Sequence, residues 1–276
     1  MLIEFKDVQI EVSGLPIMVK SANLSYTSNI EHVYGVGYRG CVGYNMNGTP
    51  TNNLNLNYIM EISNDPNFSC VHNFVENYHL SNFPGINIVA GNISGVYYPI
   101  KYTINFDANN GMLDTSIDYE NYYQTSGNLN TGQSLFYNTS SNDDIAHVWT
   151  SSLNIDKEPL LNLHIIGFNY NCLLNWEPTY SIGQNKPIAV DLIGGRQTLS
   201  LTLKNLNTIN FTGMNFKEYF NKNNITIDIK PINALFNNST NQLSIRGLSS
   251  GYINNYEINM QENDFVRIKM DIYKDF

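Results

Sequence analysis

The sequence predicts a mainly β fold made of two tandem β-sandwich or β-barrel domains, each with one short flanking α-helix. Two observations lead to this prediction. Stretches in which every second residue is apolar, the period of a half-buried strand, recur along most of the chain. A hairpin made of two such stretches also occurs twice, once before the middle of the chain and once at its end.

The repeated hairpin opens with a glycine-led turn and a Tyr-x-Ile-Asn strand. Residues 95–106 read Gly-Val-Tyr-Tyr-Pro-Ile-Lys-Tyr-Thr-Ile-Asn-Phe, and residues 247–260 read Gly-Leu-Ser-Ser-Gly-Tyr-Ile-Asn-Asn-Tyr-Glu-Ile-Asn-Met. After an Asn/Asp-rich turn, each strand returns with alternating apolar residues: Leu113, Thr115, Ile117 and Tyr119 in one copy, Val266, Ile268, Met270 and Ile272 in the other. We interpret the two hairpins as corresponding parts of a tandem duplication.

The first copy spans residues 1–123. Strands are predicted over 2–12, 18–26, 30–37 and 54–59, with a turn over 13–16 and a tight turn at Asn47-Gly48. Between Asp65 and Tyr78 the apolar spacing changes to three and four residues, which predicts a short amphipathic helix that starts at Asp65-Pro66. A strand over 86–89 and the repeated hairpin complete this copy.

The second copy spans residues 159–276 and keeps the same order. Strands over 161–170 and 199–203 precede a helix-like stretch over 214–220, a strand over 225–229 and the second hairpin. The spacing between corresponding residues changes only from about 145 to about 154 positions, which is typical of a duplication. Residues 124–158, rich in Asn, Ser, Gly and Thr, are predicted to form a linker or an arm.

Composition restricts the possible functions. The chain has 276 residues, only 14% of them charged, and a formal net charge of −9. It therefore lacks the basic surface with which proteins grip nucleic acid. The three cysteines, Cys41, Cys70 and Cys172, form no paired motif, which favours folding in a reducing cytosol. We expect no membrane segment and no signal peptide, because no apolar run approaches about 20 residues and the N-terminus has no basic-then-apolar pattern.

No catalytic or metal-binding pattern is visible. Residues 35–40, Gly-Val-Gly-Tyr-Arg-Gly, have the spacing of a dinucleotide fingerprint, but Gly-broken β-like sequence follows, so a glycine-rich strand or bulge is predicted. The five histidines show no zinc spacing, and Asp143-Asp144 lacks a calcium loop. Asp107 and Asp114 flank a hairpin turn, where a structural role is expected and a glycosidase pair is the catalytic alternative. We therefore expect no enzymatic activity, no cofactor and no bound metal.

The nineteen tyrosines allow two interpretations. Alternating tyrosines in strands are ordinary components of sheet and barrel cores. They could instead line a sugar-binding platform. The alternative function is accordingly that of a lectin-like, carbohydrate-binding β module.

The hairpin over 95–106, its counterpart over 247–260 and the order of strands, tight turn, outer helix and closing hairpin resemble bacteriophage tail-tube proteins. The resemblance covers most of both copies and rests on pattern. It implies a β-sandwich or barrel of tail-tube type whose sheets join neighbours into a ring, usually sixfold, around a DNA-conducting lumen. Tube subunits usually carry one such domain. Two per chain resembles the hub of contractile-tail baseplates, where a trimer has pseudo-sixfold symmetry.

The resemblance implies a structural virion protein of the tail, assembled in the host bacterial cytoplasm. In the same phage context, the alternative is a carbohydrate-binding β module of a phage fibre or receptor-binding protein. Expected partners are further copies of the chain, as a trimer or hexamer, and other tail or baseplate proteins, with DNA only in passage through the lumen. An acidic lumen would repel the DNA backbone and let it slide. The polar alternates of the two closing hairpins are the candidate lumen or subunit-contact residues: Lys101, Asn105, Asp114, Asp118, Glu257, Asn259 and Asp271.

Overall fold

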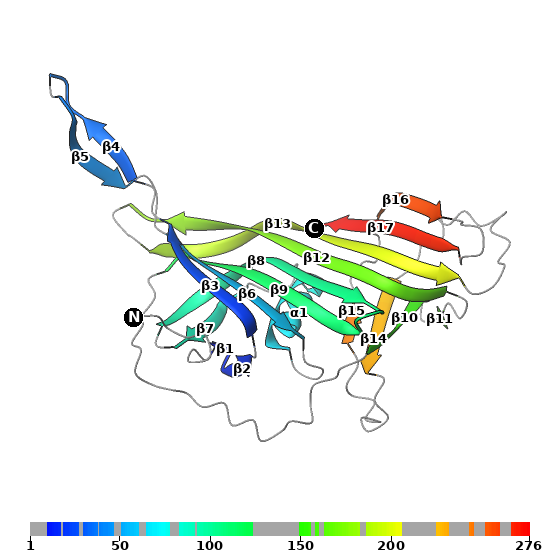
Figure 1. Cartoon of the computed structure of the whole chain (residues 1–276). Coiled ribbons are helices and arrows are strands. Elements are labelled where there is room, and N and C mark those ends of the chain that lie inside the picture. The colour runs from blue at the N-terminus through cyan, green and yellow to red at the C-terminus, as the bar shows by residue number, and fades with distance from the viewer. Residues whose placement is uncertain are drawn as a thin grey trace.

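The computed structural model describes residues 10–17, 19–27, 30–37, 39–46, 51–60, 65–77, 83–91, 93–123, 149–155, 158–159, 163–182, 186–205, 225–231, 243–245, 252–259 and 266–276. The fold of these residues is mainly β, as the sequence predicts, with a single helix among them (Figure 1).

The elements of the first half are β1 (Ile10–Val12), β2 (Leu15–Ile17), β3 (Val19–Thr27), β4 (Ile30–Tyr34), β5 (Cys41–Met46), β6 (Thr51–Ile59), α1 (Pro66–Glu76), β7 (Ile86–Ala90), β8 (Ile93–Asp107) and β9 (Met112–Asn121). Those of the second half are β10 (Trp149–Ile155), β11 (Glu158–Pro159), β12 (Leu163–Tyr180), β13 (Pro187–Asn205), β14 (Ile225–Pro231), β15 (Leu243–Ile245), β16 (Tyr252–Asn259) and β17 (Arg267–Asp275).

Most of the strands belong to one large antiparallel sheet. Eleven of the described strands form it, and its main body runs in the order β16-β17-β13-β12-β8-β9-β6-β3. Figure 1 shows these strands side by side, with β16 and β3 at the two ends of the sheet. The start of β8 bends away from this body to pair with β7, which in turn carries β1 and β2.

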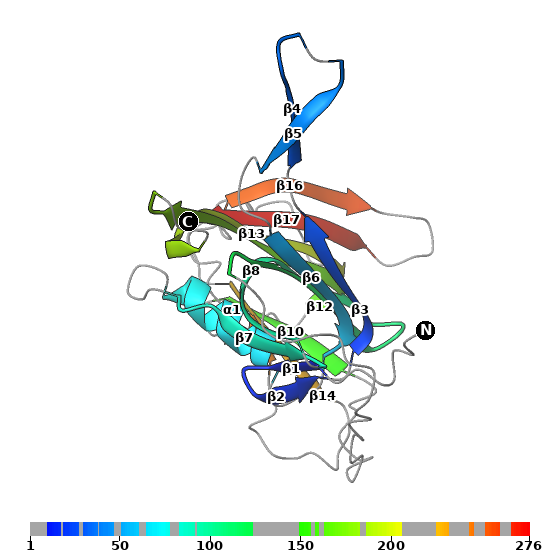
Figure 2. The same cartoon turned by 90° about the vertical axis from the view of Figure 1, so that its left-hand side faces the viewer.

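Two smaller groups of strands accompany the large sheet. Strands β11-β10-β14-β15 form a four-stranded sheet that lies beneath β12 and β13 of the large sheet. Strands β4 and β5 form a hairpin that projects from the body of the molecule in both views (Figures 1 and 2). The described fold is thus layered, with the main body of the large sheet above and α1, β7, β10 and β14 below it.

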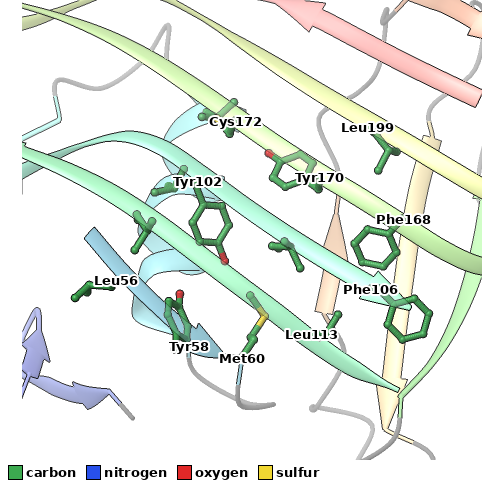
Figure 3. Close-up of a cluster of buried hydrophobic side chains, with 14 of the residues drawn as sticks. Leu56, Tyr58, Met60, Tyr102, Phe106, Leu113, Phe168, Tyr170, Cys172 and Leu199 are labelled. Atoms are coloured by element: carbon green, nitrogen blue, oxygen red, sulfur yellow. The ribbon is translucent and has the colours of Figure 1, made fainter. Parts of the chain in front are cut away.

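Alternation of side chains gives the large sheet one apolar and one polar face. On β9, for example, Leu113, Thr115, Ile117 and Tyr119 are buried, and the residues between them are less buried or exposed. Figure 3 shows Tyr102 and Phe106 of β8 beside Phe168 and Tyr170 of β12 in the apolar layer. The core therefore lies between the large sheet and the elements beneath it.

Helix α1 covers the apolar face of the first half and confirms the predicted helix. Asp65 is its N-cap, and its carboxylate accepts hydrogen bonds from the backbone N–H groups of Asn67 and Phe68 at 2.8 and 3.0 Å. Pro66 follows at the first helical position, where its missing N–H costs nothing. The predicted helical stretch over 214–220 lies outside the described residues.

The strand pairings of the first half recur in the second half. The pairs β1–β2, β1–β7 and β7–β8 correspond to β10–β11, β10–β14 and β14–β15. The pairs β6–β9 and β8–β9 correspond to β13–β17 and β16–β17, and the long β12–β13 hairpin corresponds to β3–β6 together with β4–β5. Among the described strands, only the pair β8–β12 has no counterpart.

Register irregularities recur at corresponding residues. The extra residue in β3 is Lys20 and that in β12 is Ile166, each skipped between paired neighbours. The extra residue in β8 is Ile100, and that in β16 is Asn254. Because a β-bulge fixes the register on either side of it, these matches align the halves residue by residue.

Two features of the strand arrangement differ from the sequence predictions, and the glycine-rich stretch described below is a third difference. Residues 149–155 and Glu158, which the sequence predicts to be linker, lie in β10 and β11, and β11 continues into Pro159 of the predicted second copy. Their strand pattern is weak because Ser151 interrupts the apolar alternation of Trp149, Leu153 and Ile155. The sheets of the two halves are also joined into one, since β8 pairs with β12. The domain bounds at 123 and 159 stay predictions, and residues 124–148 lie outside the described part.

The glycine-rich stretch over 35–40 lies between β4 and β5, where the hairpin turns, and no helix follows it. Gly37 and Gly40 have positive φ angles of 90° and 119°, a backbone conformation that favours glycine. The predicted glycine-rich strand or bulge is therefore wrong for the described residues of this stretch, which form the turn of the hairpin.

Candidate functional site

The polar face of the large sheet contains all seven candidate residues from the sequence. Lys101, Asn105, Asp114, Glu257 and Asn259 are exposed, and Asp118 and Asp271 are partly buried. Lys101 lies opposite Asp118 in the β8–β9 register, and Asn105 lies opposite Asp114. The structure thus brings these residues onto one surface. Their lumen or contact role stays a prediction.

A lateral row of this face connects the two halves. Asp271 lies opposite Ser200, Ser200 opposite Asn169, Asn169 opposite Asn105, and Asn105 opposite Asp114. Side chains directly opposite one another on adjacent strands have Cβ atoms about 5 Å apart. The row therefore forms a continuous polar surface across β17, β13, β12, β8 and β9.

Most charged groups on this face have neighbours of opposite charge or amide neighbours. Lys20 and Asp114 form an exposed ion pair, and Asn55 donates a hydrogen bond from Nδ2 to the Asp118 carboxylate. In the β16–β17 register, Glu257 lies opposite Lys269 and Asn259 lies opposite Arg267. The face is therefore mixed in charge. The net charge of −9 gives no uniformly acidic surface on the sheet face that carries the candidate residues.

The β8–β12 pairing, here called the seam, joins the halves. Its register runs from Gly167 opposite Asp107 to Leu173 opposite Lys101. On the polar face, Asn169 donates from Nδ2 to Oδ1 of Asn105, and the Thr103 hydroxyl lies 3.4 Å from Oδ1 of Asn171.

The apolar side of the seam is fully enclosed. The rings of Phe106 and Phe168 stack with centroids 5.4 Å apart, and Tyr102, Ile104, Tyr170 and Cys172 are at most 1% exposed. Burial raises the pKa of the Cys172 thiol to about 12, so the thiol stays protonated and acts as a small apolar side chain. Edge-to-edge joining thus creates a continuous core beneath both halves.

An aromatic cluster reinforces the seam at one end. The Trp176 ring of β12 lies 5.6, 5.4 and 5.3 Å, centroid to centroid, from Phe74 of α1, Phe83 and Tyr98 of β8. Its Nε1 donates a hydrogen bond to the carbonyl of Pro99 at 2.6 Å. The extended hairpin of the second half is therefore anchored on the helix of the first half.

The outer edges of the large sheet are β3 and β16. In the described part of the chain, β3 pairs only with β6 and β16 only with β17. By the repeated register, β3 corresponds to β12 and β16 corresponds to β8, the two strands of the seam. The molecule therefore presents, at its two ends, the same pair of edges that it joins in its middle.

Corresponding residues are more exposed at the outer edges than in the seam. Tyr26 on β3 is 60% exposed, whereas Cys172 at the corresponding position of β12 is 0% exposed. Ile258 on β16 is partly buried, and its counterpart on β8, Ile104, is fully buried. The open edges thus retain apolar surface that the seam covers.

A shallow depression lies where the seam ends. Its volume is about 530 Å³, and its lining includes Asp107, Asn169, Thr202, Lys204 and Arg267 but no tyrosine. Several tyrosines are buried in the core instead: Tyr58, Tyr97, Tyr98, Tyr102, Tyr119, Tyr122 and Tyr170. These residues therefore form part of the core and not an exposed sugar platform.

The open edges were not identified from the sequence. Alternation predicts which residues share a face, but it does not tell which strands become neighbours. The available signal was the duplication itself, because a repeated unit with two unsatisfied edges can join to its own copy. Asn23 and Tyr26 of β3 were therefore missed, whereas Glu257 and Asn259 of β16 were among the predicted contact residues.

Membrane-spanning helices and metal sites are without a candidate in the described residues. The described part of the chain offers no membrane-spanning candidate among its helices, and its His, Cys, Asp and Glu side chains form no group of three or more suited to a metal ion. The expectations of no cofactor and no enzymatic activity stay predictions.

No known protein-family model matches the sequence, and no curated protein is significantly similar to it. The geometry of the polar face and the sheet edges is therefore the main basis for inferring a function.

Proposed function

We propose that this chain is a structural protein of a bacteriophage tail, a tube, tube-initiator or baseplate-hub component that assembles into a ring around a DNA-conducting lumen. The observation that carries the proposal is the correspondence between the outer edges, β3 and β16, and the joined edges, β12 and β8. A chain with two complementary ends associates head to tail, and such association closes into a ring when the rotation per subunit permits it.

In this proposal the two halves are tandem domains of tail-tube type, over residues 1–123 and 159–276. Three chains would supply six domain positions in a trimer with pseudo-sixfold symmetry, and a hexamer is the larger alternative. Ring closure pairs every outer edge, which removes a surface that would otherwise promote aggregation. The other partners are further tail or baseplate proteins, and the protein resides in the virion tail after assembly in the host bacterial cytoplasm.

The polar face of the large sheet is the proposed lumen surface. Asn105, Asn169 and Ser200 lie among acids and bases on this face, so DNA meets no continuous basic surface. Sustained DNA binding depends on many phosphate contacts from Lys and Arg. A neutral-to-mixed surface therefore lets DNA pass without being held.

The first test is native mass spectrometry with negative-stain imaging over a concentration series of the purified chain. Trimers with six lobes support the hub form, and sixfold rings or open-ended tubes support the tube form. A strict monomer at high concentration contradicts self-assembly. Mass spectrometry of purified virions of the phage that encodes the chain tests the location, since absence from the particle contradicts a tail role. Binding on a glycan array would favour the carbohydrate-binding alternative.

A further inference from the structure

We infer that β3 of one copy pairs with β16 of a second copy as antiparallel strands, in the register of the internal seam, with Asn23 opposite Asn259. The inference rests on the proposed head-to-tail assembly and adds the partner strands, their direction and their register. The partner is thus a second copy of this chain.

The register follows from the matched irregularities. Ser21 follows the bulge at Lys20 as Gly167 follows the bulge at Ile166, so Asn23 occupies the position of Asn169. Asn255 follows the bulge at Asn254 as Lys101 follows the bulge at Ile100, so Asn259 occupies the position of Asn105. Transferring the seam to the outer edges pairs Asn23 with Asn259, Leu24 with Ile258, Ser25 with Glu257, Tyr26 with Tyr256 and Thr27 with Asn255.

The transferred register places matching chemistry together. The seam has an amide pair, Asn169 to Asn105, and the transferred register again puts one asparagine opposite another, at Asn23 and Asn259. Both of these side chains are exposed in the single chain. On the apolar side, the same pairing would cover Tyr26, whose counterpart Cys172 is buried by β8. Burial of an exposed aromatic side chain is a substantial favourable contribution to association.

A single chain cannot make this pairing with itself. Strands β3 and β16 lie at opposite ends of the large sheet, with β6, β9, β8, β12, β13 and β17 between them (Figure 1). Among the described strands, each of the two has a neighbour on one side only, β6 or β17. The two edges therefore meet only between copies.

Cysteine cross-linking tests the register in the full-length chain. Two double variants are in register, Asn23→Cys with Asn259→Cys and Thr27→Cys with Asn255→Cys. Two others exchange the partners, Asn23→Cys with Asn255→Cys and Thr27→Cys with Asn259→Cys. All use the same four exposed positions, in a Cys41→Ser background that removes the exposed native thiol. The exchanged partners differ by four residues along a strand, about 13 Å, which a direct disulfide does not span.

Mild oxidation of the two in-register variants should give covalent multimers in denaturing gels, with at least a tenfold higher yield than the exchanged variants. Equal or higher yields from the exchanged variants overturn the inference. If native mass spectrometry shows assembly but neither in-register variant cross-links, the inference is also overturned. That result leaves the proposed ring intact. In-register cross-links found only in open assemblies that never close support the edge pairing but contradict the proposed ring. A wild-type chain that stays monomeric at all concentrations overturns the pairing itself.

Discussion

Asn169 of β12 donates a hydrogen bond from Nδ2 to Oδ1 of Asn105 of β8, across the strand pairing that joins the two halves of the sheet. Every other strand pair of the described chain has a counterpart in the opposite half. The seam therefore shows how an edge strand of one half pairs with an edge strand of the other. Substitutions of its residues test how the halves are joined.

The seam amides should be energetically coupled. We expect Asn105→Ala and Asn169→Ala each to lower the free energy of unfolding by about 0.5–1 kcal/mol, because a hydrogen bond between exposed neutral groups contributes little net stability. The double variant should lose less than the sum of the two single variants. Urea unfolding of the three variants measures the coupling. Strict additivity would show that the amide contact contributes nothing.

Trp176 should contribute more to the stability of the fold than any polar group of the seam. We expect Trp176→Ala to lower the free energy of unfolding by about 3 kcal/mol, because the ring packs on Phe74, Phe83 and Tyr98. Trp176→Phe is the matched control. It retains an aromatic ring but loses the bond to the Pro99 carbonyl, and should cost about 1 kcal/mol. Denaturant unfolding followed by circular dichroism measures both. Equal losses would contradict a packing role.

Asn67 links helix α1 to the sheet. It is fully buried, its Nδ2 donates to the Tyr58 hydroxyl at 2.9 Å, and its Oδ1 accepts from the Tyr119 hydroxyl. We expect Asn67→Leu to cost about 2–3 kcal/mol, because it removes the partner of two buried hydroxyls. Adding Tyr58→Phe and Tyr119→Phe should recover part of the loss. If it does not, the cost of Asn67→Leu comes from packing and not from hydrogen bonding.

The sequence predicted local structure well where one period dominated. Helix α1 followed from the three-and-four spacing of Phe68, Val71, Phe74 and Val75, and β9 from the strict alternation of Leu113 to Tyr119. Alternation also placed the candidate polar residues on one face. These features depend on neighbouring residues in the chain, which is why sequence reasoning reached them.

Longer-range features could not be predicted in the same way. The predicted strand over 199–203 is only the end of β13, which begins at Pro187. The earlier part was missed because exposed Ile188 and Ile193 and the Gly194-Gly195 pair disrupt the alternation. The adjacency of β8 and β12 depends on the fit between two edges that are distant in sequence. The duplication contained this information only indirectly, through the correspondence of β3 with β12 and of β16 with β8.

Alkaline pH should destabilise the fold. Burial raises the pKa values of Tyr58, Tyr102, Tyr119 and Tyr170 well above their ordinary value near 10. Above about pH 10 the unfolded chain loses these protons and the folded chain keeps them, so the free energy of unfolding falls by about 1.4 kcal/mol per pH unit for each tyrosine. Below pH 10 both states are protonated and this dependence vanishes. Tyr102→Phe removes one such group, so urea midpoints measured from neutral to alkaline pH should give a slope smaller by about 1.4 kcal/mol per unit. An unchanged slope would show that the Tyr102 hydroxyl titrates alike in both states.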